Sequence, residues 1–480
     1  MTAMKKYIYM AVAAIAALSS CTKEEESNAS LNDNGSFYAT IEDGTTRTTL
    51  DSDKKVLWSA GDQININGTA YTLSDGNGTT KAKFTGESVS GTPYNAYYPA
   101  NICSGTTATL PATQEYDATT NGISNLPMYA QSTTHDLVFK NLCGVLAITV
   151  PQSEMSKVSS ITVYADQQLN GAISVDYNSG DPTVTFSPEQ TADEYKKVTL
   201  TFASAKTIST SETFYIAIPA QTYSTLDIVV AGEIAVTDGT VTAKLLASKA
   251  ASMVVNRNNI YPITFSGATA IRGTTAVSST AGRSGNTCGW VQLWKEGPKF
   301  AEFNVGATIS DYASATAYTT ANVGGLYTWC GTNDAHTSYS DDHLTNNTYS
   351  GNSDTAKQLW GDNWKMPGIS KGLTALHSNC TWTWCDGSTT QYVSGCTLAG
   401  YKVTGNGSYA FNNIFLPAAG YLDSTGTIKN EGTYGYFWST GPKSEDENTY
   451  ALSQYFKQGT ITDSYEANRH DAFSVRPVLK

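Results

Sequence analysis

Short runs of alternating apolar and polar residues dominate the chain up to about residue 265. Alternation with a period of two puts every second side chain on one face of a β-strand, so one face is buried and the other is wet. The runs are Phe37/Ala39/Ile41, Ile64/Ile66, Leu146/Ile148/Val150, Ile161/Val163/Ala165, Phe214/Ile216/Ile218 and Leu226/Ile228/Val230. Short strands separated by turn signals, without helical stretches, predict β-sandwiches. Residues 37–265 are long enough for two, 37–150 and 151–265, with the seam near Val150 and Pro151.

The last part of the chain has a different pattern. Eight of the nine tryptophans follow residue 289, which indicates a second, unlike module over residues 289–480. Ile369, Leu373 and Leu376 have helical spacing after Pro367, and residues 356–360 predict another short turn of helix. Between the modules, residues 266–288 are small, polar and rich in Gly and Thr, which predicts a linker.

The N-terminus predicts export. Lys5 and Lys6 precede an apolar run, residues 7–18, that is too short to span a bilayer. Small residues then lead to Cys21, in a pattern that resembles the lipobox of bacterial lipoproteins. That resemblance implies a signal peptide over residues 1–20 and a Cys21 carrying acyl chains, palmitate among them, that anchor the protein in the outer membrane. The alternative is an ordinary secretory signal beside an unrelated cysteine.

An acidic run follows at once, residues 24–26, inside a Ser- and Asn-rich stretch. It resembles the surface-export signal of Bacteroidota lipoproteins, and residues 21–36 also suit a solvated tether.

Composition narrows the function classes. The chain has 29 Tyr, 40 Gly and only 15% charged residues, as β-rich extracellular proteins have. Its net charge of −12 argues against nucleic acid and anionic membrane surfaces as partners. With Cys21 lipidated, seven cysteines remain, an odd number that leaves at least one without a partner in the same chain. Cys143, in an apolar run, is predicted to be a buried small hydrophobe.

Several short sequence motifs in the first half occur in the same order as in a known family, which they resemble. They are Thr46-Arg47-Thr48, Val56-Leu57-Trp58, Gly61-Asp62-Gln63-Ile64, Tyr94-Asn95-Ala96-Tyr97-Tyr98-Pro99 and Phe139-Lys140-Asn141-Leu142-Cys143-Gly144-Val145-Leu146. The order resembles the fimbrillin family of type V pilins and their lipoprotein relatives. This implies a mainly β protein with two tandem transthyretin-like β-sandwiches, secretion as a surface lipoprotein and, for many members, assembly into fimbriae.

The resemblance also implies a route to assembly. In that family an arginine-specific protease removes the first strand, and a strand of the next subunit fills the groove. Arg47 follows the first predicted strand, so a cut between Arg47 and Thr48 would remove that strand together with the lipid. The alternative is that Arg47 is a turn residue that is never cut.

A second set of words follows residue 289. They are Phe303-Asn304-Val305-Gly306-Ala307, Gly325-Leu326-Tyr327-Thr328-Trp329, Trp360-Gly361-Asp362-Asn363-Trp364, Phe415-Leu416-Pro417-Ala418-Ala419-Gly420-Tyr421, Gly435-Tyr436-Phe437-Trp438 and Phe473-Ser474-Val475-Arg476-Pro477-Val478. This series resembles the FISUMP domain, which implies an α+β, C-type-lectin-like fold with long loops.

Candidate ligand contacts lie in this last module. An exposed indole stacks on the apolar face of a sugar, which makes Trp329 and Trp438 candidates, although tryptophans in repeated family words are more often core. The long loop over residues 331–352 adds polar candidates: Asp334, His336, Asp341, Asp342 and His343. Carboxylates and imidazoles also suit a divalent metal, but their spacing matches no known site, so a solvated loop is preferred and no metal or cofactor is predicted.

Catalytic motifs are absent: the sequence has no Gly-x-Ser-x-Gly, His-Glu-x-x-His or Walker loop, and we expect no enzyme. We expect a fimbrial tip subunit that joins other fimbrial subunits by strand exchange and presents its last module to a glycan or a protein on a host or bacterial surface. One alternative is a surface lipoprotein that binds glycan or protein without polymerising. A remote one is an extracellular enzyme.

Overall fold

The structure is a computed structural model of the chain. It describes residues 35–42, 57–118, 122–123, 125–177, 180–236, 239–249, 252–278, 287–309, 312, 315, 317–344, 349–387, 397–410, 412–442 and 449–480. Cys21, Arg47 and Thr48 lie outside these residues.

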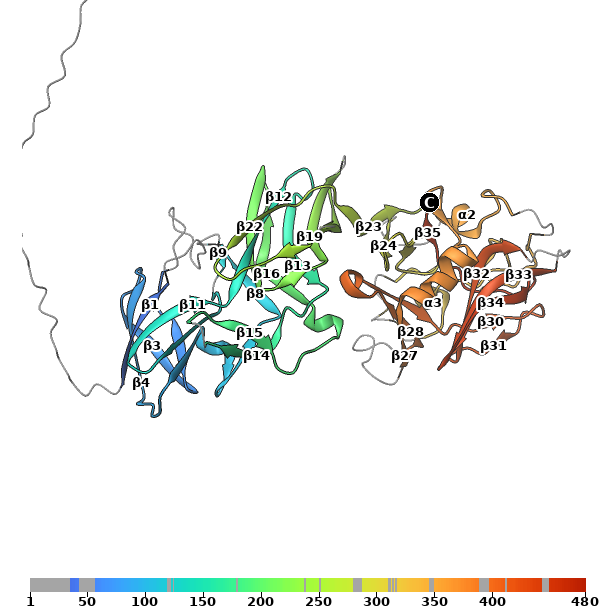
Figure 1. The fold of residues 1–480 in the computed structure, drawn as a ribbon. Coiled ribbons are helices and arrows are strands. Elements are labelled where there is room, and N and C mark those ends of the chain that lie inside the picture. The colour runs from blue at the N-terminus through green and yellow to red at the C-terminus, as the bar shows by residue number, and fades with distance from the viewer. Residues whose placement is uncertain are drawn as a thin grey trace, which may run out of the picture.

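The fold is mainly β, as predicted, with 51% of the described residues in strands and 8% in helices. Figure 1 shows a blue strand module, a green one and an orange-to-red one that carries the helices. Of the helices that the structure describes, none is long and apolar enough to cross a bilayer.

The first module is a closed barrel rather than the predicted sandwich. Its strands pair around a full ring in the order β1-β11-β10-β5-β2-β3-β4. The strands are β1 (Ser36–Ile41), β2 (Gln63–Ile66), β3 (Thr69–Asp75), β4 (Lys81–Gly86), β5 (Tyr94–Tyr98), β10 (Met128–Ser132) and β11 (Asp136–Asn141). Closure leaves no free edge in the ring, and aromatic side chains fill its interior, with Trp58 in edge-to-face contact with Phe84, Tyr98 and Phe139.

Strand β1 completes that ring. It runs antiparallel to β4 and parallel to β11. Phe37, Ala39 and Ile41 point into the core at 3% exposure or less, whereas Tyr38 faces solvent. The predicted alternation is therefore confirmed on the strand that the sequence places before Arg47.

The second module is a two-layer sandwich. One layer has the order β17-β12-β22: β12 (Cys143–Pro151), β17 (Ser211–Pro219) and β22 (Ile260–Thr264). The other layer includes β13 (Lys157–Ala165), β16 (Lys197–Thr207), β19 (Leu226–Val236) and β20 (Gly239–Lys249). Buried side chains of both layers form one core, in which Ile148 of β12 and Ile161 of β13 are fully buried.

The seam between these modules lies earlier than Val150 and Pro151. Strand β12 pairs along its length with β17 and β22, so it belongs to the second module. Its Cys143 is buried, as predicted. Short strands before the seam also pair across it, because β7 joins β14 and β8 joins β16. The small strands are β6 (Cys103–Ser104), β7 (Thr107–Leu110), β8 (Thr113–Asp117), β9 (Gly122–Ile123), β14 (Gly171–Asp176), β15 (Thr183–Phe186), β18 (Thr222–Tyr223) and β21 (Met253–Val254).

The predicted linker contains a strand. Within 266–288, β23 (Thr269–Ala276) pairs antiparallel with β20 of the sandwich and with β24 (Thr287–Gln292) of the last module. These pairings make one eleven-stranded sheet that runs through both modules, from β26 (Trp364–Lys365) to β9. The composition of the segment predicted a linker, but two flanking strands supply the hydrogen bonds that make it a strand.

Apolar contacts reinforce this junction. Ile271 of β23 is fully buried against Tyr164, Val229 and Leu246 of the sandwich and Tyr409 of the last module. We call these five residues the junction cluster.

The last module packs small sheets around two cores. Its strands are β25 (Lys299–Ala301), β26 (Trp364–Lys365), β27 (Thr381–Asp386), β28 (Ala399–Thr404), β29 (Asn413–Pro417), β30 (Tyr421–Leu422), β31 (Ile428–Lys429), β32 (Tyr434–Pro442), β33 (Tyr450–Lys457), β34 (Thr460–Asn468) and β35 (Val478–Leu479). Its helices within the described residues are α1 (Thr320–Val323), α2 (Thr355–Trp360), the π-helix η5 (Ile369–Thr374) and α3 (Ala375–Asn379). Among the 3-10 turns that the structure describes are η1 (Ala100–Ile102), η2 (Asp193–Tyr195) and η6 (Gly407–Tyr409). Both predicted helical segments are therefore confirmed, as α2 and as η5 with α3.

Candidate functional site

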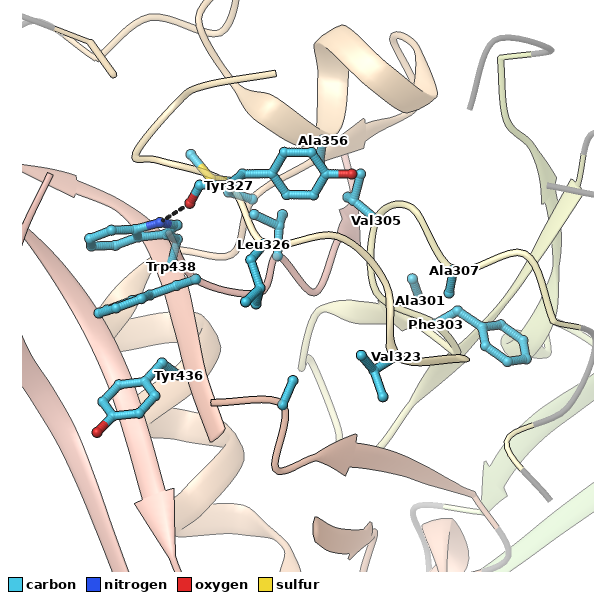
Figure 2. Packing of buried hydrophobic residues seen from close by; sticks show 14 of the residues in the cluster. Ala301, Phe303, Val305, Ala307, Val323, Leu326, Tyr327, Ala356, Tyr436 and Trp438 are labelled. Carbon is cyan, nitrogen blue, oxygen red and sulfur yellow. Dashed lines mark hydrogen bonds between the residues drawn. The ribbon is translucent and has the colours of Figure 1, made fainter. Parts of the chain in front are cut away.

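The two predicted indoles lie in the core of the last module. Trp329 and Trp438 are both fully buried. The Trp438 Nε1 donates to the Tyr327 carbonyl oxygen at 2.7 Å, as Figure 2 shows, and its ring stacks on Phe473 with centroids 4.3 Å apart. The Trp329 Nε1 donates to the Ser439 carbonyl oxygen at 2.9 Å. Neither ring has a face open to a sugar, so their assignment as ligand contacts is wrong and the core reading holds.

Asp334 and His336 brace the start of the loop. The Asp334 carboxylate accepts from the Thr320 Oγ1 at 2.6 Å, from the Leu326 amide at 3.1 Å and from the His336 Nδ1 at 3.3 Å. Burial alone would raise the pKa of Asp334, but hydrogen bonds from His336 and Thr320 outweigh it and hold that pKa below its ordinary value. Both side chains are largely buried, so their visible role is to shape the loop.

Asp342 organises the next turn. Its carboxylate accepts from the Thr328 Oγ1 at 2.6 Å, the Thr332 amide at 2.7 Å and the Asn333 amide at 3.0 Å. A carboxylate that accepts several backbone and hydroxyl donors fixes a loop locally. Asp342 is therefore also committed to loop structure.

Asp341 and His343 are the two predicted residues that the structure brings together at the surface, and His470 joins them. The Asp341 Oδ1 lies 2.5 Å from the His343 Nδ1, and its Oδ2 lies 2.7 Å from the His470 Nδ1. The two imidazole rings touch, with centroids 4.0 Å apart. We call Asp341, His343 and His470 the surface triad. Its side chains are 42%, 10% and 36% exposed, so it is reachable from solvent.

Electrostatics around the surface triad are mixed. Burial opposes ionisation of Asp341, but the hydrogen bonds and charge of His343 and His470 hold its pKa below the ordinary value. Beside it, burial, with a further contribution from Asp423, raises the pKa of Asp471 to about 6. The three donor atoms of the surface triad lie within 4.8 Å of one another, which makes it the group among the described residues able to hold a metal ion.

His470 was not predicted from the sequence. It lies after β34, far along the chain from the loop, within Asn468-Arg469-His470-Asp471. No spacing rule relates it to His343, because the contact exists only after the loop folds back on the sheet.

A buried arginine holds the two parts of the surface triad together. The Arg469 guanidinium is fully buried and lies over the Trp329 ring, 4.3 Å from its centroid. Its Nη1 donates to the Leu344 carbonyl oxygen at 3.1 Å, and its Nε donates to the Tyr450 carbonyl oxygen at 3.0 Å. Since Leu344 follows His343 and Arg469 precedes His470, these bonds position both imidazole-bearing residues. The buried Trp329 ring therefore packs beneath Arg469, which positions the surface triad, but Trp329 itself is not exposed.

Comparisons with known proteins place the chain only loosely. No protein-family model matches it, and no curated relative matches its sequence. Solved structures similar to it include three, from Bacteroides ovatus, Bacteroides thetaiotaomicron and Bacteroides eggerthii, each described as a "putative cell adhesion protein". Their sequence identities are 13%, 13% and 11%, with TM-scores of 0.28, 0.22 and 0.24. The matches cover 49%, 48% and 48% of this chain and 94%, 92% and 85% of the respective neighbours.

Proposed function

We propose that this protein is a cell-surface adhesin of the fimbrillin type, anchored at first through Cys21, that joins other fimbrial subunits by strand exchange at its barrel. Its last module presents the ligand-binding surface, as a tip subunit would. Cell adhesion is also the role named for the three Bacteroides proteins, but the proposal depends on strand β1.

Strand β1 is the observation that supports exchange. It is one strand of a closed ring, and the sequence places it immediately before the Arg47 segment. Its loss would leave β4 and β11 with unpaired edges, and would empty the core positions of Phe37, Ala39 and Ile41. An incoming strand with the same alternation restores both the hydrogen bonds and the packing.

Strand β35 is unsuited to act as the donor. Val478 pairs with Phe300 of β25 and with Lys365 of β26, so β35 is occupied on both edges. In this proposal the barrel is therefore the only exchanging part, and the last module points away from the fibre.

The last module is proposed to bind its ligand without chemical turnover. Its surface offers Asp341 and His470 as exposed acceptor and donor groups beside a braced loop, which suits the hydroxyls of a glycan or the polar face of a protein. The family resemblance noted at Phe303-Asn304-Val305 and Phe473-Ser474-Val475 supports a lectin-like binding role for this module.

One observation favours the second candidate, a surface lipoprotein that keeps β1 and does not polymerise. Glu42, directly after β1, makes a two-pronged ion pair with Arg257 of the second module, at 2.6 and 3.0 Å. The Glu42 Oε1 also accepts from the Asn141 amide at 2.7 Å. Both side chains of the pair are mostly buried, so the end of β1 is held firmly.

The deciding experiment is the intact mass and N-terminal sequence of the protein from native cell envelopes. A chain that begins at Thr48 and co-purifies with a fibre supports the adhesin with strand exchange. Arg47→Ala should then block processing, whereas Lys54→Ala, at the next basic residue, should not. A chain that begins at an acylated Cys21 and carries no fibre partner contradicts strand exchange and leaves the anchored surface binder.

A further inference from the structure

We infer that the surface triad is a binding site for one divalent transition-metal ion, zinc being the best fit, with Asp341, His343 and His470 as its protein ligands. The inference requires neither processing at Arg47 nor a fibre, but it concerns the same surface, at Asp341 and His470, that the adhesin proposal gives to ligand binding.

The geometry of the surface triad supports the site. Both Nδ1 atoms converge on the one carboxylate, His343 on Oδ1 and His470 on Oδ2. Tetrahedral zinc with bonds of about 2.0–2.1 Å holds its ligand atoms roughly 3.4 Å apart. The two nitrogen–oxygen contacts, at 2.5 and 2.7 Å, would each open by less than about 1 Å to admit the ion, and the ligand atoms already lie within 4.8 Å of one another.

The chemistry of the ligands selects the metal class. Two imidazoles and one carboxylate suit zinc and its neighbours in the first transition series, whereas calcium and magnesium prefer oxygen ligands alone. A neutral imidazole presents Nδ1 to a metal when its proton is on Nε2. With three protein ligands, a zinc ion keeps a position open to water or to an external group.

Hydrogen bonds from neighbouring residues fix the backbone around the surface triad. The fully buried Arg469 donates to the carbonyl oxygen of Leu344, next to His343, and to that of Tyr450. The Tyr339 hydroxyl donates to the His470 carbonyl oxygen at 2.9 Å. The His470 amide in turn donates to the Asn468 Oδ1 at 3.0 Å. Such supporting contacts orient metal ligands and raise affinity.

The competing interpretation is that the surface triad is only a hydrogen-bonded cluster that closes the loop. His377 offers the comparison, because its Nδ1 binds the Asp463 Oδ2 at 2.8 Å in a simple pair without a third ligand. A pair of this kind is common on surfaces and holds no metal with useful affinity.

The test is a titration of the full chain, stripped of metal by a chelator, with Zn²⁺ by calorimetry and with Co²⁺ by visible absorption. We expect one ion per chain, an absorption spectrum of low coordination number, and no comparable binding of Ca²⁺ or Mg²⁺. Asp341→Asn, His343→Ala and His470→Ala should each weaken binding at least tenfold, and His377→Ala should leave it unchanged.

Folding of each variant is checked by circular dichroism, and X-ray absorption of the zinc-loaded wild type counts imidazole ligands directly. Two imidazoles in that spectrum support the site even if a variant fails to fold. Absence of saturable one-to-one binding in the wild type would overturn it, as would binding that survives all three substitutions.

Discussion

Two buried arginines, Arg469 and Arg476, link separate segments of the last module by hydrogen bonds. Arg476 is fully buried, and its guanidinium donates to the Asn304 Oδ1 and to the carbonyl oxygens of Ala301, Glu302 and Phe415, at 2.7–3.0 Å. These acceptors come from separate segments, so one side chain satisfies carbonyl groups that would otherwise be buried without a donor. This gives a physical reason for an arginine in the word Phe473-Ser474-Val475-Arg476.

Arg476→Lys should destabilise the module. Lysine keeps the charge but cannot reach four acceptors in a planar arrangement. We expect a loss of at least about 1.5–3 kcal/mol, the scale for one lost hydrogen bond to a charged group. The free energy of unfolding from a urea titration measures it. The Lys402→Arg change, at a half-buried lysine on β28, is the control. An Arg476→Lys protein as stable as the wild type would contradict the role given to Arg476.

Trp438→Phe separates core from ligand contact. The change removes the indole donor, so the Tyr327 carbonyl oxygen keeps only the Phe473 amide, at 2.9 Å. Loss of one net hydrogen bond should cost about 0.5–1.5 kcal/mol of unfolding free energy. Because the ring is fully buried, binding of any glycan found on an array should be unaffected at temperatures where the variant is folded. Selective loss of glycan binding with unchanged stability would show that the indole is reached by ligand.

At the scale of elements, strand β1 has one face buried in the barrel core and the other exposed to solvent. Phe37 is fully buried and meets Tyr71 and Tyr94 edge to face, with ring centroids 5.1 and 4.9 Å apart. Its neighbour Tyr38 is 54% exposed. The two residues are adjacent in sequence and opposite in environment, which makes them a matched pair for substitution.

Phe37→Ala should cost about 3–5 kcal/mol of barrel stability, as expected for deleting a large buried aromatic side chain. Tyr38→Ala should stay within about 0.5 kcal/mol, as surface substitutions usually do. Urea titrations of both variants measure the difference. Equal losses would mean that β1 does not sit in the barrel with the register described above.

Periodicity carried the sequence prediction well for strand positions and poorly for strand partners. The runs at Phe37, Leu146 and Phe214 all became strands with the predicted faces buried. Alternation says nothing of which strand lies alongside, so the sequence could not show that β1 closes a barrel or that β12 joins the second module. For the same reason, β23 was hidden by its Thr- and Gly-rich composition, since its neighbours provide most of its stability.

The candidate site shows a similar limit. Asp341 and His343 were found because they are close in sequence, and Trp329 and Trp438 were misassigned because residue type does not reveal burial. Arg469 and His470 depend on a contact between a loop and the end of β34. Contacts of that range are set by tertiary folding and leave no local signal.

At the scale of the whole molecule, the junction between the sandwich and the last module is partly polar. The Arg272 Nη2 of β23 lies 2.5 Å from the Glu302 Oε1. Lys244 of β20 lies opposite Arg272 in the register of the two strands. Burial, helped by the positive charge of Arg272 and opposed by Glu302, lowers the pKa of Lys244 to about 8. A second cation is therefore held where it is poorly solvated.

Stability should depend on pH through Lys244. Its folded pKa of about 8 lies below the ordinary value of 10.5, so the folded state binds the proton less well than the unfolded state does. The resulting penalty is full below pH 8 and is relieved as the pH rises toward 10.5. Urea midpoints at pH 7, 8, 9 and 10 should rise for this contribution, and Lys244→Met should flatten the curve. An identical pH profile in the variant would show that Lys244 is not the group responsible.

Strand β23 determines how the connection between the two modules responds to mechanical force. A flexible linker would let the last module reorient, and it would extend under load before the force reached the sandwich. Here the segment pairs through backbone hydrogen bonds with β20 on one side and β24 on the other, and its own Ile271 side chain packs in the junction cluster. Tension on the last module therefore reaches the sandwich directly, and the chain can lengthen at this point only after rows of hydrogen bonds have broken.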